Sequence, residues 1–149
     1  MVKRKRQPKD VPALLADLAS TATFVRRTAI IDLVEKGAPE ASLPLQGLLT
    51  DREAAIRACA AWALGELGVN GAMHDLIASL KDMDVDVRRA AVQSLAQLAL
   101  PGSHAALESA SVDSDRWVAE WARRGLAGLQ KTTLKIRRRP KAAGETPSN

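Results

Sequence analysis

Apolar residues recur along the chain at a fixed step of 31 residues. Four positions stay apolar in every copy, with no insertion between copies: Leu14, Leu45, Leu76 and Leu107; Val25, Ile56, Val87 and Val118; Ala29, Ala60, Ala91 and Ala122; Leu33, Leu64, Leu95 and Leu126. Self-similarity at a period of roughly 20–50 residues is the sequence signature of a repeat architecture. Residues 11–130 therefore consist of four copies of one unit.

The spacing of apolar residues inside each unit predicts two helices. Val25, Ala29 and Leu33 stand four residues apart, which places them on one face of a helix. Leu14 and Leu18 form a shorter stripe of the same kind. We expect a short helix A and then a longer helix B in every unit. The expected ranges are 11–19, 42–49, 72–80 and 103–110 for helix A, and 23–36, 52–67, 84–99 and 115–130 for helix B.

The residues between these helices agree with that division. Asp51 and Asp82 precede helix B, where a carboxylate can cap the free backbone N–H groups. Gly37 and Gly68 follow helix B, where glycine commonly ends a helix. No run of residues has the alternation of a strand, so the fold class is all-α. One helix pair cannot bury its apolar face alone, and the units are therefore expected to stack into an α-solenoid.

The stretch 48–68, LLTDREAAIRACAAWALGELG, closely resembles the short HEAT repeat of phycobiliprotein-lyase-like proteins, and residues 79–99 fit the same pattern. The resemblance covers residues 11–130. It implies a right-handed α-solenoid of four HEAT-like repeats whose B helices line the concave surface. Because this repeat serves scaffolds, lyase subunits and metal hydroxylases alike, it implies the fold and leaves the function open.

The two inner copies share an Asp and an Arg at a spacing of six residues: Asp51 with Arg57, and Asp82 with Arg88. The resemblance implies a structural ladder of Asp–Arg hydrogen bonds along the stack, and anion binding by these arginines is the alternative. The outer copies have Ser20 with Arg26 and Asp113 with Ala119. We therefore expect the ladder to fail at both ends, where terminal repeats are often atypical.

All four aromatic residues lie on the predicted B helices, about 125° away from the core columns. Tryptophan and arginine are the residues most enriched at binding hot spots. We expect a partner-binding surface on the helix B face, formed by Phe24, Ile31, Trp62, Trp117, Trp121 and Arg124. The alternative is that the rings pack between B helices or cover the open end of the stack.

The net charge of +5 is divided unevenly along the chain. Residues 1–10 hold five basic and one acidic side chain, and residues 131–149 hold six and one, whereas the body holds 11 and 15. We expect basic tails over 1–10 and 131–149, the second disordered. Candidate anion contacts in them are Lys3, Arg4, Lys5, Arg6, Arg137, Arg138 and Arg139. Solubility, nucleic-acid or ribosome contact, and a targeting signal are the alternative roles.

Motifs for catalysis, cofactors or metals are lacking. His74 and His104 stand in different repeat columns, with no zinc spacing, no phosphate-binding glycine loop and no nucleophile paired with a histidine. The repeated His-Glu pairs that hold two irons in HEAT-repeat hydroxylases such as deoxyhypusine hydroxylase are absent. Helical-repeat DNA glycosylases are a remote alternative, because the body here is acidic. The single cysteine, Cys59, is expected to be a small packing residue.

The function favoured by the sequence is a non-catalytic scaffold for protein–protein interaction. The alternatives are a nucleic-acid-associated protein that uses its basic tails and an accessory subunit of the phycobiliprotein lyase type. No apolar stretch approaches the roughly 18 residues needed to cross a bilayer, and the N-terminus lacks the apolar core of a secretory signal. We expect a soluble cytoplasmic protein with a protein partner and without a metal or cofactor.

Overall fold

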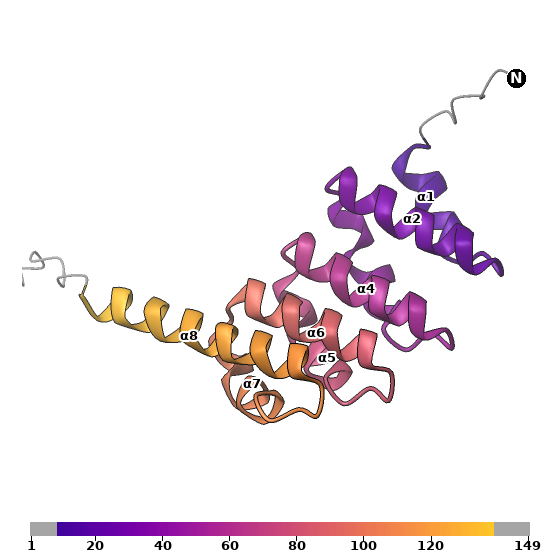
Figure 1. The fold of residues 1–149 in the computed structure, drawn as a ribbon. Coiled ribbons are helices and arrows are strands. Elements are labelled where there is room, and N and C mark those ends of the chain that lie inside the picture. The colour runs from indigo at the N-terminus through magenta and orange to yellow at the C-terminus, as the bar shows by residue number, and fades with distance from the viewer. Residues whose placement is uncertain (1–8, 139–149) are drawn as a thin grey trace, which may run out of the picture.

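The structure, a computed structural model, describes residues 9–138, and its regular elements over that range are helices arranged in pairs (Figure 1). The A helices are α1 (Val11–Asp17), α3 (Ser42–Leu48), α5 (Met73–Ser79) and α7 (His104–Ala110). The B helices are α2 (Thr23–Glu35), α4 (Ala54–Glu66), α6 (Val85–Leu98) and α8 (Arg116–Arg138). Single 3₁₀ turns precede α3, α5 and α7, at Pro39–Ala41, Asn70–Ala72 and Pro101–Ser103.

The helices form two layers. The B helices lie side by side in one layer, and the A helices lie behind them (Figure 1). Each B helix packs against the A helix of its own pair, and consecutive B helices pack against one another. Contacts of this kind, between neighbouring units only, define a solenoid. The predicted all-α fold with four stacked helix pairs is confirmed.

The repeated apolar columns form the core between the layers. Leu45, Leu76 and Leu107 are fully buried, and Leu14 nearly so. Burial of such a side chain contributes about 1.5–3 kcal/mol to stability. The column that begins with Val25 is fully buried in the second, third and fourth repeats but only half-buried in the first, because no earlier repeat covers it.

Helix B ends where the chain turns back toward the next A helix. Gly37 and Gly68 occupy that turn with φ of +60° and +65°. This left-handed region suits glycine because it has no Cβ. Ala99 stands at the equivalent position of the third repeat and has a φ of 48°, which is strained for a residue with a side chain.

The last B helix is longer than predicted. The residue in the Gly37 column of the fourth repeat is Gln130, a good helix former, and the first proline after it is Pro140. Nothing in the sequence therefore breaks the helix at residue 130, and α8 continues to Arg138. The prediction that helix B ends at 130 and that a disordered tail begins at 131 is wrong for residues 131–138. Residues 1–8 and 139–149 lie outside the described residues.

The candidate binding surface on the B helices

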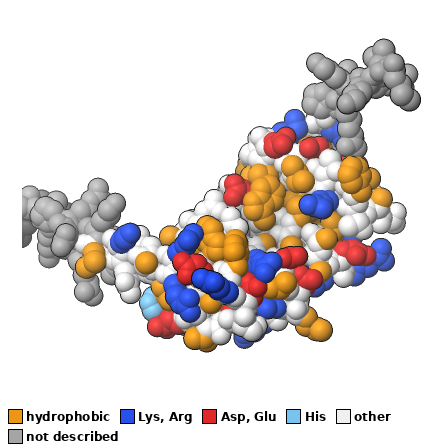
Figure 2. All heavy atoms as spheres, in the orientation of Figure 1, with side chains coloured by type: hydrophobic (Ala, Val, Ile, Leu, Met, Phe, Trp, Pro, Cys, Tyr) orange, Lys and Arg blue, Asp and Glu red, His pale blue; other side chains and the backbone are white. Residues whose placement is uncertain are grey.

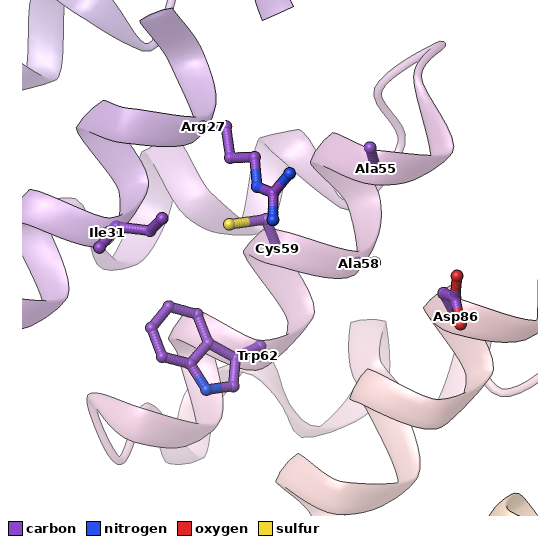
Figure 3. A pocket seen from close by; sticks show the side chains of 7 residues that line it. All are labelled: Arg27, Ile31, Ala55, Ala58, Cys59, Trp62 and Asp86. Atoms are coloured by element: carbon purple, nitrogen blue, oxygen red, sulfur yellow. The ribbon is translucent and has the colours of Figure 1, made fainter. Parts of the chain in front are cut away.

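A groove crosses α2, α4 and the start of α6 on the exposed side of the B layer (Figure 3). Its volume is about 510 Å³, and its walls are formed by Arg27, Ile31, Ala55, Ala58, Cys59, Trp62 and Asp86. The Trp62 indole projects from α4 beside Ile31 of α2, and the Arg27 side chain extends over Cys59 (Figure 3). The floor of this groove is mainly apolar.

A second groove crosses α4, α6 and α8. Its volume is about 400 Å³, and it is lined by Glu66, Gln93, Ala96, Gln97, Trp121 and Arg124. The two carboxamides of α6 and the Arg124 guanidinium are polar groups that line this groove. It offers hydrogen-bond donors and acceptors beside one aromatic ring.

The two grooves belong to one repeated surface. Ile31, Trp62, Gln93 and Arg124 are equivalent residues of the four repeats, because each stands 31 residues after the one before. The surface formed by the lining residues of both grooves is called the B face below. In Figure 2, apolar side chains form separate patches along this layer, with basic and acidic side chains between them.

The structure brings four of the predicted contact residues onto the B face. Ile31 and Trp62 line the first groove, and Trp121 and Arg124 line the second. Phe24 lines neither groove but is 72% exposed at the start of α2. The contribution of these residues to partner binding stays a prediction.

The tryptophans combine packing with exposure. Trp62 and Trp121 are half-buried and pack against the hydrophobic core. Trp117 is 39% exposed, and its ring centroid lies 5.3 Å from that of Trp121 at an interplanar angle of 42°. The Arg124 guanidinium lies 5.3 Å from the Trp121 ring centroid, a cation–π contact that contributes about 0.5–1 kcal/mol when exposed.

A ladder of arginines and aspartates links successive repeats on the side where helix B begins. Arg57 donates two hydrogen bonds to the carboxylate of Asp82, from Nε at 2.8 Å and from Nη2 at 2.9 Å. Its Nη1 donates to the main-chain carbonyl of Asp51 at 2.9 Å. These bonds lower the pKa of Asp82 and raise that of Arg57. Each arginine therefore bonds a carbonyl of its own repeat and a carboxylate of the next.

The prediction that the ladder fails at both ends is wrong. In the first repeat Arg26 donates to the main-chain carbonyl of Ser20 at 2.7 Å, a bond that needs no carboxylate, and to Asp51 at 3.3 Å. At the other end Asp113 accepts from Arg88 at 3.0 Å, although the ladder position of its own repeat holds Ala119 instead of an arginine. The side-chain pairs are 25 residues apart, whereas the spacing of six joins each arginine to a backbone carbonyl.

A second cross-repeat pair was not predicted. Arg89 donates to Asp115 from Nη2 at 2.7 Å and from Nε at 3.1 Å. Asp115 also accepts from the backbone N–H of Val118 at 3.0 Å, and these bonds lower its pKa to about 2. Among the described interfaces the pair forms between the third and fourth repeats, since Ala58 replaces the arginine in the second repeat and Arg27 of the first repeat does not pair with Glu53. The arginine is missing from the second and fourth copies, at Ala58 and Glu120, so the position did not stand out as a repeated column in the sequence.

Within residues 9–138, no group of three His, Cys, Asp or Glu side chains gathers to hold a metal ion. Burial raises the pKa of the Cys59 thiol, and the positive charge of Arg27 opposes this shift.

Arg137 and Arg138 end α8, but their side chains, like Arg139 and the segment Lys3–Arg6, lie outside the described part. None of the helices described is long and apolar enough to span a bilayer.

These features define the class of protein: an α-solenoid in which one helix-pair interface is repeated. The family model for HEAT repeats matches residues 11–82, and the same helix-pair geometry continues through α7 and α8. No curated protein matches the sequence.

Three solved structures share this architecture. Human deoxyhypusine hydroxylase, in complex with glycerol, is 28% identical with a TM-score of 0.70 over 85% of this chain and 45% of that protein. The complex of CpcE and CpcF of phycocyanin lyase from a Nostoc species is 23% identical, with a TM-score of 0.75 over 95% of this chain and 63% of that one. An engineered protein is 21% identical, with a TM-score of 0.66 over 81% and 62%.

The chain therefore spans from under half to somewhat under two thirds of the length of these proteins. At 23% and 21% identity, the second and third likenesses concern the fold alone. All three are consistent with stacked helix pairs.

Proposed function

We propose that this chain is a non-catalytic scaffold that binds a protein partner through the B face. The observation that carries the proposal is the position of the two grooves, which together cross all four B helices and hold the half-exposed rings of Trp62 and Trp121. Partly buried aromatic side chains beside a guanidinium group are the usual anchors of a protein interface. A preformed surface also limits the entropy lost on docking.

The dimensions of the B face suit a protein rather than a small molecule. Neighbouring packed helices lie about 8–10 Å apart, so four B helices present a surface about 30 Å long. A stable interface buries about 800 Å² on each partner, which a surface of that length can provide. Both grooves are open along the layer, whereas small-molecule sites enclose most of their ligand.

Site-specific photo-crosslinking in the native cell tests the proposal. A photoreactive residue replaces Ile31 on the B face in one variant and Leu43 in the control. Leu43 is 77% exposed on α3, in the A layer. We expect a discrete crosslinked protein from position 31 and none from position 43. A nuclease arm separates the nucleic-acid alternative, because a partner held through nucleic acid is lost on digestion. Equal crosslinking from both positions would contradict the proposal.

A further inference from the structure

The first two repeats carry charge on both sides of the apolar floor of the B face. On α2, Arg27, Ile31 and Glu35 stand four residues apart, and on α4 the residues at the same positions as Ile31 and Glu35 are Trp62 and Glu66. Residues four apart lie on the same face of a helix. Each helix therefore crosses the surface with an apolar side chain in the middle and a carboxylate at its C-terminal edge.

The charged side chains at these edges form no ion pairs within the described part of the chain. Arg27 extends over Cys59 (Figure 3) and forms no ion pair with another described residue. Glu53 follows Arg27 by 26 residues, as Asp115 follows Arg89, but the first two do not pair. Glu35 and Glu66 are exposed, and neither forms an ion pair with another described residue. By contrast, Arg89 is bound by Asp115 and Asp86, and Arg124 by Glu120.

Glu66 also lies in a position that disfavours a carboxylate. It is the last residue of α4, whose final turn contains no basic residue, and Leu67 follows it. The C-terminus of a helix carries partial negative charge, so an acidic side chain there is unfavourable. A residue in an unfavourable position, with no compensating contact inside the fold, is expected at a functional surface.

The distance between the edges fits a helix. Arg27 and Glu35 are eight residues apart on α2, which is about 12 Å at 1.5 Å per residue. An α-helix with its side chains is about 10–12 Å across. A helix laid along the stack would therefore place its flanks at the two charged edges and its underside on Ile31 and Trp62.

We propose that the B face of the first two repeats binds an amphipathic α-helix whose flanks carry opposite charge. Its apolar stripe contacts Ile31 and Trp62, a flank of Lys or Arg residues faces Glu35 and Glu66, and a flank of Asp or Glu residues faces Arg27. This inference rests on the scaffold function proposed above and names the chemistry of the partner segment. Apolar contact supplies affinity, and the charges fix the direction in which the helix lies.

Selection from a displayed peptide library tests this proposal on the full chain. The probe is a set of 18-residue helical peptides with a fixed leucine stripe and random Lys, Arg, Glu, Asp or Gln at both flanks. We expect selected peptides to carry bases on one flank and acids on the other. The bait with Arg27→Glu, Glu35→Lys and Glu66→Lys should select the opposite arrangement. It should also bind the original winners about two- to five-fold more weakly for each reversed edge, the range typical of exposed ion pairs.

Glu40→Lys with Glu108→Lys is the matched control, because both residues are exposed and lie in the η1 turn and on α7. It should leave selection unchanged, and circular dichroism should show that no bait melts below the parent chain. Absence of any enrichment, or the same flanks on the reversed bait, would overturn the proposal. If the crosslink from position 31 persists in the reversed variant at full yield, the scaffold function stands and only the charge-directed helix is lost. If no crosslink forms at all, the scaffold function itself fails.

Discussion

Ser94 of α6 lies against Gly65 of α4 so closely that a Cβ added at position 65 would be 2.3 Å from Ser94 Oγ. The same hydroxyl donates a hydrogen bond to the main-chain oxygen of Ala61 at 2.8 Å. Both residues are buried. The side chain of Ser94 in the third repeat therefore packs directly on the backbone of α4 in the second repeat. Residue 65 must lack a side chain for the two helices to approach so closely.

At the interface between the third and fourth repeats, the glycine lies on the other helix of the contacting pair. Ala96 occupies the column of Gly65, and Gly125 occupies the column of Ser94. A Cβ at Gly125 would lie 3.0 Å from the Cβ of Ala96. In both interfaces one member of the contacting pair is glycine, so the size of one residue is matched to that of its partner in the neighbouring repeat.

Gly65→Ala is predicted to destabilise the protein. Alanine is the better helix former by about 1 kcal/mol, so a loss can come only from overpacking. Because the new Cβ would also lie 2.9 Å from the Cα of Ser94, rotation of the serine side chain cannot relieve the contact. We expect a loss of about 1–3 kcal/mol in urea unfolding. Gly47→Ala is the control, since a Cβ there meets nothing within 4 Å, and it should stabilise slightly.

Ser94→Gly should reduce the penalty of Gly65→Ala, because it removes the Oγ and Cβ contacts and leaves only the contact with the Cα of residue 94. The double variant reproduces the alanine–glycine pair of the following interface. Ser94→Gly alone loses a buried hydrogen bond and helix propensity, so the informative quantity is the effect of Gly65→Ala within that background. A double-mutant cycle should give a coupling energy of about 1–2 kcal/mol, and additive effects would disprove the steric account.

Asp113→Ala is predicted to destabilise the protein by about 1–3 kcal/mol, as expected for removing the acceptor of a charged donor. Arg88 of the preceding repeat binds this carboxylate at 3.0 Å. If pairing occurred within a repeat, Asp113 would face Ala119 and the change would be nearly neutral. Asp75→Ala, at an exposed position on α5, should stay within about 0.5 kcal/mol. Chemical denaturation of both variants decides between the two pairings.

Stability should fall in acid partly through Asp115. Its pKa in the folded protein is about 2, below the ordinary value near 3.9 that it regains on unfolding. The unfolded state therefore binds more protons between these values, and the stabilising contribution, complete above about pH 4, is lost as the pH falls toward 2. Asp115→Asn keeps a capping side chain but should reduce the fall in the urea midpoint between pH 5 and pH 2. An unchanged pH profile would rule out this contribution.

Two aromatic substitutions should distinguish a ring that packs against the core from a ring that is free to contact a partner. Trp62 packs against the core, and its replacement by alanine should cost about 2 kcal/mol, less than the 3–5 kcal/mol of a fully buried ring. Phe24→Ala removes a ring that is 72% exposed and should change stability by less than about 0.5 kcal/mol. Thermal melts measure both. A neutral Trp62→Ala would mean that the ring serves binding alone.

Most of the fold follows from the repeated columns in the sequence. Except for the end of α8, every helix begins and ends within two residues of its predicted limits, because the apolar columns that define the helices also form the core. The end of α8 was misjudged because the repeat was extrapolated through Gln130, where no glycine stops the helix. The 3₁₀ turn at Pro39–Ala41 and its equivalents carry no apolar period and were not predicted.

The site could be predicted only in part. The stripe that holds Ile31 and Trp62 follows from helical geometry, and these residues do line one groove. Pairing across repeats cannot be read from spacing along one helix, so the sequence related Arg57 to Asp51, whose carbonyl it does bind, but missed its carboxylate partner, Asp82 of the next repeat. The balance of packing and exposure at Trp62 depends on how deeply α2 and α4 approach each other, which a column of residue types does not specify.

Ala119 occupies the column in which Arg26, Arg57 and Arg88 stand in the first three repeats, and it is buried. A repeat copied from this chain and joined after α8 would bring an aspartate that finds no cation to neutralise it. Lengthening the array by design would therefore require a guanidinium at position 119 before any new unit is added. One methyl side chain thus sets how many modules this scheme of stacking can accept.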